Sequence, residues 1–188
     1  MKIYNMDCML AMKEMSDNQF DLAIVDPPYG IDIANDDRQG KKFKRSATKR
    51  KNYGKKDWDT HAPSKDYFIE LKRVSMHQII WGVNYYKCSK INSVKSYKFR
   101  WNGMLQHDMK NKEIRIHPTQ KPVSLYEWLL MKYAKEGDKI LDTHLGGGSI
   151  AIACHNLGYD LTGYEIDKEY YNAAIKRINQ HKAQKRLF

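Results

Sequence analysis

Short apolar runs alternate with helical patterns along most of this 188-residue chain, and this alternation limits the folds that it can adopt. Strands are expected at residues 2–5, 21–25, 77–81, 139–142 and 160–165. Helices are expected after Asp7 and Ser64 and at residues 123–134, 149–157 and 168–181. Strands that are separated by helices pair in parallel and are covered on both faces. The sequence therefore predicts a doubly wound, mostly parallel α/β sheet.

The size and composition of the chain fit one such domain. With 41% hydrophobic residues, a chain of this length can bury a single core. No apolar run approaches the ~18 residues that a membrane-spanning helix needs, so we expect a soluble, cytoplasmic protein. The three cysteines, Cys8, Cys88 and Cys154, are far apart, which argues against a disulfide framework and against a zinc site. We expect no metal.

The middle of the chain carries the excess of positive charge. The net charge of the whole chain is +11, and the segment from Arg38 to Lys56 contains ten Lys or Arg residues and no acidic residue. Such a density of like charge indicates a polyanion partner, or else a solvated loop that aids solubility. Aromatic residues such as Trp58 lie beside these charges, where they can stack on bases or anchor a loop to the core. The candidate nucleic-acid contacts are Arg38, Lys41, Lys42, Lys44, Arg45, Lys49, Arg50 and Lys51.

A glycine-rich turn follows the strand expected at 139–142 and opens the next helix. The glycines Gly146, Gly147 and Gly148 have no Cβ atoms, so a ligand can approach the backbone closely. The spacing is not G-x-G-x-x-G, which disfavours a dinucleotide. Glu165 ends the following strand, where its carboxylate can accept hydrogen bonds from two ribose hydroxyls. The alternative is a plain glycine turn with a surface glutamate.

The tetrapeptide Asp26-Pro27-Pro28-Tyr29 closes the strand expected at 21–25. Two prolines fix φ and end the ladder, so a carboxylate, a backbone carbonyl and an aromatic face are organised around one small volume. A planar base with an exocyclic amino group would fit there, although an ordinary loop would also explain the motif. In a third stretch, residues 117–122, Lys121 is placed to hold a ligand carboxylate, unless the stretch is only a proline-bracketed connector.

Taken together, the tetrapeptide at 26–29, His117-Pro118-Thr119-Gln120-Lys121-Pro122 and the run from Asp142 to Gly148 resemble a DNA amino-methyltransferase. Their order resembles the β group of adenine-N6 and cytosine-N4 enzymes. The runs at 3–8 and 79–85 resemble that family as well. The resemblance implies a single Rossmann-like domain over residues 1–188 that uses S-adenosylmethionine as methyl donor, in a restriction–modification setting of bacterial or phage origin.

The resemblance also implies roles for individual residues. Glu165 would bind the ribose of the cofactor, and Asp7 would lie near its adenine. Asp142, His144 and the glycines 146–148 would line the methionine part. Thr119 and Lys121 would contact its polar end.

On the substrate side, Asp26 and the carbonyl of Pro27 would accept hydrogen bonds from the target amino group, and Tyr29 would stack on a base flipped out of double-stranded DNA. The tetrapeptide favours adenine N6 as the target. Cytosine N4, an RNA substrate and an inactive protein that only binds nucleic acid are the alternatives, and a homodimer is a further expectation.

The chain departs from the family pattern in two places. Thr143-His144 stands where the family usually has Pro-Phe, and three glycines stand where it has Gly-Ser-Gly. Between residues 86 and 97 the chain is too short for the helix and strand that the family places there. We therefore expect an incomplete recognition region at about 87–116, and the run of positive charge predicts a basic insert at about 36–62.

Overall fold

The computed structural model describes residues 1–32, 35, 56–83, 86 and 115–184. The eight predicted nucleic-acid contacts between Arg38 and Lys51 lie outside these described residues, as does most of the predicted recognition region. No helix among the described residues is long and apolar enough to cross a membrane.

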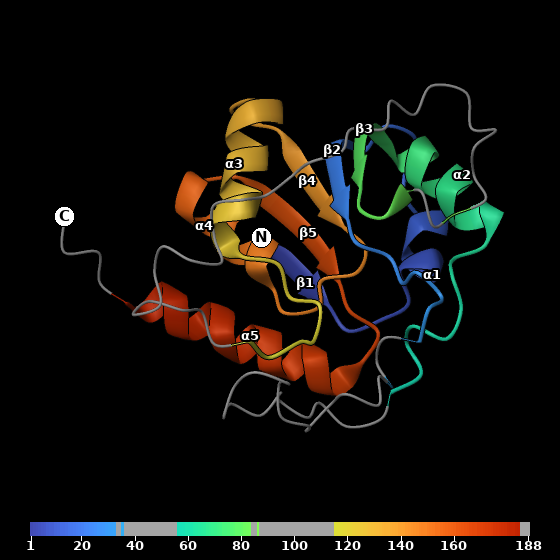
Figure 1. The fold of residues 1–188 in the computed structure, drawn as a ribbon. Helices are drawn as coiled ribbons and strands as arrows, with labels where there is room; N and C mark the ends of the chain where they lie inside the picture. The colour runs from blue at the N-terminus through green and yellow to red at the C-terminus, as the bar shows by residue number, and fades with distance from the viewer. Residues whose placement is uncertain (33–34, 36–55, 84–85, 87–114, 185–188) are drawn as a thin grey trace.

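In the part of the chain that the structure describes, five parallel strands form one sheet in the order β1-β5-β4-β2-β3 (Figure 1). They are β1 (Lys2–Tyr4), β2 (Phe20–Val25), β3 (Ser75–Ile80), β4 (Lys139–Asp142) and β5 (Asp160–Tyr164). In the register of the central strands, Leu22 lies beside Ile140, and Leu141 lies beside Thr162. The sheet confirms the predicted parallel α/β class and all five expected strands. Strand β3 begins two residues earlier than expected because it follows α2 directly, and it ends at Ile80.

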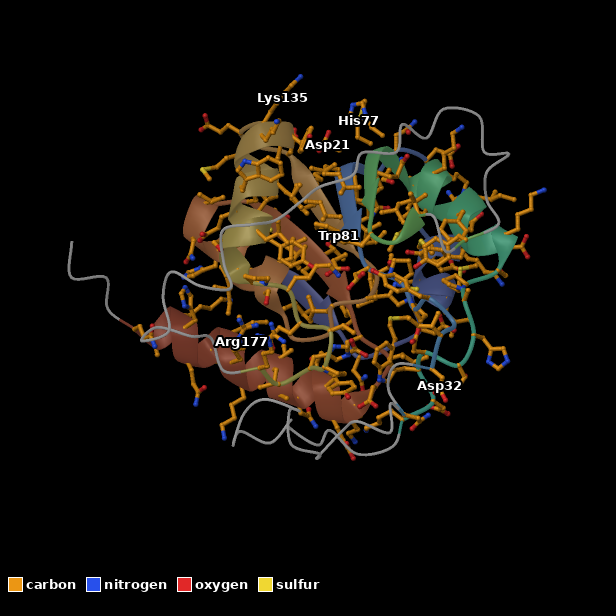
Figure 2. All side chains as sticks on the ribbon, in the orientation of Figure 1. Asp21, Asp32, His77, Trp81, Lys135 and Arg177 are labelled. Atoms are coloured by element: carbon orange, nitrogen blue, oxygen red, sulfur yellow. The ribbon has the colours of Figure 1, made fainter. Side chains whose placement is uncertain are left out.

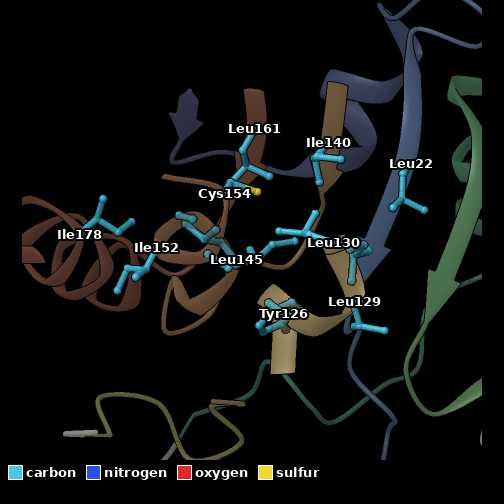
Figure 3. Packing of buried hydrophobic residues seen from close by; sticks show 14 of the residues in the cluster. Leu22, Tyr126, Leu129, Leu130, Ile140, Leu145, Ile152, Cys154, Leu161 and Ile178 are labelled. Atoms are coloured by element: carbon cyan, nitrogen blue, oxygen red, sulfur yellow. The ribbon is translucent and has the colours of Figure 1, made fainter. Parts of the chain in front are cut away.

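Within the described residues, five helices cover the two faces of the sheet. They are α1 (Cys8–Lys13), α2 (Lys65–Val74), α3 (Val123–Tyr133), α4 (Ser149–Leu157) and α5 (Lys168–Ala183). Successive side chains of β2 point to opposite faces, as strand geometry requires. Leu22 and Ile24 pack with α3, α4 and α5 (Figure 3), whereas Ala23 and Val25 pack with α1 and α2. Both faces of the sheet are therefore buried, which makes the fold doubly wound.

Two aspartates cap helices that begin near the carboxyl ends of strands β1 and β5. The Asp7 carboxylate accepts a hydrogen bond from the Met9 amide at 2.8 Å at the start of α1. The Asp167 carboxylate accepts from the amides of Glu169 and Tyr170 at 2.8 and 3.1 Å at the start of α5. Each carboxylate satisfies amides that have no partner within the helix.

Candidate functional site

A cavity of about 460 Å³ lies beyond the carboxyl ends of β2, β4 and β5, which is where ligands bind in open α/β sheets. All three motifs that the sequence singled out contribute to its wall. From the predicted site residues, the lining includes Asp26, Pro28, Thr119, Lys121, His144, Gly146, Gly147 and Glu165. The fold therefore brings together residues that are far apart in the sequence.

The glycine turn, residues Gly146–Gly148, is fixed by the strand beside it. The Gly146 amide donates to Oε2 of Glu165 at 2.8 Å, and the Leu145 amide donates to the Tyr164 carbonyl at 2.8 Å. A Cβ at Gly147 would lie 2.6 Å from the Gln120 side-chain oxygen, so only glycine leaves this contact unstrained. The turn thus presents bare backbone to the cavity.

Glu165 follows β5 directly and is buried. Its second oxygen, Oε1, accepts a hydrogen bond from the Asp167 amide at 2.9 Å. Burial raises the pKa of Glu165, whereas the bonds from the Asp167 and Gly146 amides lower it. Each oxygen of an ionised carboxylate can accept a further bond. The carboxylate is therefore held in one position and can still accept hydroxyl donors.

The Asp26 corner, residues Asp26–Tyr29, places its carboxylate between two donors. Oδ1 of Asp26 accepts from the Tyr29 hydroxyl at 2.7 Å, and Oδ2 accepts from the Lys121 ammonium. The ammonium also lies 4.9 Å from the ring centre of Trp81, just beyond the end of β3 (Figure 2). Lys121 thus contacts the carboxylate of the Asp26 corner, and its contact with a cofactor stays a prediction.

Three other segments hold the rest of this corner. Oδ1 of Asp59 accepts from the Tyr29 amide at 2.6 Å and from the Gly30 amide at 3.0 Å. The Tyr86 hydroxyl donates to the Pro27 carbonyl at 2.6 Å. A Cβ at Gly82 would lie 2.4 Å from the Tyr29 ring. The position of Tyr29 therefore depends on residues far away in the sequence.

Among the predicted site residues that the structure describes, five do not line the cavity: Asp7, Pro27, Tyr29, Asp142 and Gly148. Asp7 caps α1, and a Cβ on Gly148, which has φ +71°, would lie 3.1 Å from Ile178. Asp142 is buried under the cavity and accepts from the His144 amide at 3.0 Å. Burial raises the pKa of Asp142 to about 8. The predicted ligand contacts of these residues stay predictions.

The residues Thr143-His144, which depart from the family pattern, form a partly buried hydrogen-bonded chain with Tyr67. The Thr143 hydroxyl lies 2.7 Å from the Tyr67 hydroxyl and 2.9 Å from Nδ1 of His144. Burial lowers the pKa of His144 to about 4, so the ring is neutral near pH 7. His144 lines the cavity as a neutral side chain of the turn that follows β4.

Sequence reasoning missed an aromatic wall of the cavity. The ring centre of His117 lies 4.9 Å from that of Trp58 and 4.4 Å from that of Tyr170. All three residues line the cavity. Burial lowers the pKa of His117 to about 4, so this ring is also neutral near pH 7. Two signals were present in the sequence: Trp58, one of the aromatics beside the basic run, and His117, which opens the stretch at 117–122. The contact of Trp58 with His117 fits the role of an anchor to the core.

Comparison with known proteins decides the family. A family described as DNA methylase, of the N6/N4 methyltransferase type, matches residues 33–176. The chain belongs to this family. The match covers more than half of the chain and confirms the predicted DNA amino-methyltransferase resemblance.

Two bacterial relatives are similar over about two thirds of the chain. The Type II methyltransferase M2.DpnII of Streptococcus pneumoniae is 37% identical over 131 residues, which are 64% of this chain and 48% of that protein. The Type II methyltransferase M2.LlaDCHI of Lactococcus lactis subsp. cremoris is 35% identical over 133 residues, which are 65% of this chain and 49% of that protein. This chain thus spans about half the length of the two relatives.

Solved structures share the fold. The M1.HpyAVI–SAM complex has a TM-score of 0.56 at 20% identity, covering 94% of this chain and 98% of that one. TTHA0409 of Thermus thermophilus, a DNA modification methylase by its description and complexed with S-adenosyl-L-methionine, has a TM-score of 0.53 at 14% identity. That likeness covers 98% of this chain and 97% of the other. These likenesses establish a Rossmann-like α/β fold of the methyltransferase type.

Proposed function

We propose that this chain is a DNA methyltransferase that moves a methyl group from S-adenosylmethionine to N6 of adenine. The observation that carries the proposal is the shared cavity. One wall has the glycine turn and Glu165, and another has Asp26 and Lys121. A reaction between a bound cofactor and a bound base needs both sets of groups to face the same volume.

The cavity suits a nucleoside cofactor in size and in chemistry. Its volume of about 460 Å³ lies within the ~300–1,000 Å³ of small-molecule sites. Glu165 would accept hydrogen bonds from the ribose hydroxyls, and the turn at Gly146–Gly147 would contact the methionine part. Thr119 would contact its polar end. When bound, S-adenosylmethionine supplies a methyl group on a positively charged sulfur, which is electrophilic without further activation.

The Asp26 corner would act on the target amino group. An amino group on an aromatic ring is a poor nucleophile because its lone pair is delocalised into the ring. Hydrogen bonds from its two N–H groups to Asp26 and to the Pro27 carbonyl would localise that lone pair on nitrogen. Each of these acceptor oxygens already accepts one hydrogen bond within the protein. Tyr29 and Lys121 donate to the two oxygens of Asp26, and Tyr86 donates to the Pro27 carbonyl. An oxygen with two lone pairs can accept a second bond.

A target base inside a duplex cannot reach this corner, so we propose that it is flipped out, at a cost of a few kcal/mol. Tyr29 would then stack on the extruded base. Phosphate contacts from the basic residues between Arg38 and Lys51 would offset part of this cost. We propose these roles together with a single domain over residues 1–188, an incomplete recognition region and a homodimer. We also propose that the protein acts in the cytoplasm of a bacterium, as the methyltransferase of a restriction–modification system.

The choice of adenine rests on the tetrapeptide Asp26–Tyr29, because cytosine-N4 enzymes more often begin this motif with serine. Cytosine N4 is the second candidate, since the matching family includes both types. Transfer to RNA is a further enzyme alternative. Binding of nucleic acid without catalysis is a weaker one, because Asp26, Tyr29 and Glu165 are all present.

The test is incubation of the full chain with methyl-labelled S-adenosylmethionine and unmethylated bacterial DNA, followed by nucleoside analysis. Labelled N6-methyladenine is expected. Labelled N4-methylcytosine would move the target to cytosine, and label that enters only RNA would move the substrate. No transfer to either nucleic acid would contradict the proposed activity.

A further inference from the structure

A short segment, residues 56–59, crosses from one side of the cavity to the other and contacts both. We call it the bridging segment. At its start, the Lys56 ammonium lies 2.9 Å from the Asp167 carboxylate and 2.6 Å from that of Glu169, at the start of α5. At its end, Asp59 binds the amides of Tyr29 and Gly30. Between these contacts, Trp58 lines the cavity against His117.

Asp59 is the most deeply buried carboxylate among the described residues, with 1% of its surface exposed. One oxygen accepts hydrogen bonds from two consecutive amides, at 2.6 and 3.0 Å. Hydrogen bonds that end on an ionised acceptor are about twice as strong as neutral ones. The backbone carbonyl of Asp59 also accepts from the Asp32 amide at 2.9 Å. Asp59 therefore fixes the chain on both sides of Gly30.

The loop that Asp59 fixes has little freedom of its own. Gly30 has φ +71°, and a Cβ there would lie 2.7 Å from the Ala62 amide nitrogen. The loop thus packs directly against the chain that follows the bridging segment. Since the Tyr29 hydroxyl donates to Asp26, the orientation of the Tyr29 backbone is transmitted to the carboxylate that faces the cavity.

From these contacts we infer that Asp59 is a positioning residue for methyl transfer. It does not line the cavity, and it acts through Tyr29 by setting where the ring and hydroxyl of that residue lie relative to Asp26. The inference rests on the proposed function, because only a transferase gives this positioning a catalytic consequence. It predicts that loss of Asp59 slows the transfer step and leaves cofactor binding in place.

The experiment compares Asp59→Ala and Asp59→Asn with a matched control, Asp138→Ala. Asp138 also accepts a loop amide, that of Lys135 at 2.8 Å, but it lies between α3 and β4 and outside the cavity lining. Single-turnover transfer of labelled methyl to unmethylated DNA should fall about 100-fold in Asp59→Ala, as a misplacement of about 1 Å does. The dissociation constant for S-adenosylmethionine should not change. Asp59→Asn should recover most of the rate, because its amide oxygen accepts the same two bonds.

Several results would overturn the inference. One is a transfer rate for Asp59→Ala equal to that of Asp138→Ala. Another is a transfer rate for Asp59→Asn as low as that of Asp59→Ala. A third is a loss of cofactor binding in Asp59→Ala that parallels its loss of transfer rate. Amide hydrogen exchange of the peptide containing Tyr29 and Gly30 gives a readout that needs no activity. Exchange should be faster in Asp59→Ala and close to wild type in Asp59→Asn. If wild type transfers no methyl group, the proposed function fails, and this exchange still decides whether Asp59 fixes the loop.

Discussion

The two sides of the cavity are built in different ways. The glycine turn and Glu165 follow two neighbouring strands, β4 and β5, and their amide–carboxylate bond joins residues 19 positions apart. The Asp26 corner follows β2 and is held by Asp59, Tyr86 and Lys121, which lie 30, 59 and 95 positions from their partners. The first side is thus built mainly on two neighbouring strands, with Arg177 donating to the Gly147 carbonyl, whereas the second is assembled mainly from distant side chains.

This difference has a functional consequence. The bond between Gly146 and Glu165 joins the ends of two adjacent strands, so changes in the Asp26 corner should leave cofactor binding largely unaffected. The Asp26 corner depends on several separate contacts, and a change in any of them should alter methyl transfer. Substitutions on the two sides should therefore separate transfer from cofactor binding.

The largest effect is expected for Asp26→Ala. This change removes an acceptor for the target amino group and leaves Lys121 and the Tyr29 hydroxyl without their shared partner. Methyl transfer should fall at least about 100-fold, while isothermal titration should show nearly unchanged binding of S-adenosylmethionine. Asp21→Ala is the control, since Asp21 lies at the opposite end of β2 and accepts from the Lys139 amide (Figure 2). Equal loss of transfer and of cofactor binding would show that the site has been wrongly assigned.

Glu165→Ala should give the opposite pattern. It removes the carboxylate that would bind the ribose and that holds the Gly146 amide. Loss of hydrogen bonds to a charged group costs about 1.5–3 kcal/mol, so the dissociation constant for S-adenosylmethionine should rise about 10- to 100-fold. The transfer rate at saturating cofactor should change much less. The control is Glu127→Ala on α3, where Glu127 accepts from Asn156 at 2.7 Å. Unchanged cofactor affinity in Glu165→Ala would contradict the assignment of this side.

A smaller effect is expected for Gly82→Ala. Gly82 has φ +66°, and its new methyl group would overlap the Tyr29 ring, whereas Gly137 has φ +86° and nothing within 4 Å of its Cβ position. Both alanines carry backbone strain of about 1–2 kcal/mol. Only Gly82→Ala should also lower the rate of methyl transfer, by about tenfold, because its methyl group displaces the Tyr29 ring. Equal transfer rates in Gly82→Ala and Gly137→Ala would show that the position of Tyr29 does not matter.

The last prediction concerns the pH dependence of stability. Burial raises the pKa of Asp142 to about 8 from an ordinary value of 3.8. Between these values the folded protein keeps a proton that the unfolded chain releases, so this group lowers the free energy of unfolding as pH rises from about 4 to 8. The slope is at most about 1.4 kcal/mol per pH unit.

In Asp142→Asn the side chain cannot titrate, but its oxygen can still accept a hydrogen bond from the His144 amide. In urea denaturation, its free energy of unfolding should therefore fall less than that of wild type between about pH 6.5 and 8. The neutral His117 and His144 affect stability at lower pH in both proteins, so their contribution cancels. Parallel curves for the two proteins would contradict a protonated Asp142.

The sequence predicted the local structure around the glycine turn better than that of the Asp26 corner, for a physical reason. Helix α4 and strand β4 were predicted at their observed bounds because their apolar periodicity and the glycine turn are local signals. Glu165 was found because the end of a strand is itself a local feature. By contrast, Asp59, Tyr86 and His117 act through contacts that only the folded chain creates. No pattern near Asp59 indicates that its carboxylate binds amides 30 positions away.

The pairing of Lys121 with Asp26 shows the same limit. The proline-bracketed stretch predicted a lysine that faces a ligand, and the structure does place Lys121 on the cavity wall. Its partner in the structure is Asp26, across 95 positions of sequence. A motif can thus indicate that a charged side chain serves a site, but the partner depends on the packing of strands that are distant in sequence.

The central claim is that one cavity presents a bound cofactor to the Asp26 corner. The most direct test is a crystal structure of this chain with S-adenosylmethionine. We predict the ribose hydroxyls on Glu165 and the sulfur-bound methyl group directed toward Asp26. A cofactor bound outside this cavity, or one whose methyl group is directed away from Asp26, would contradict the account.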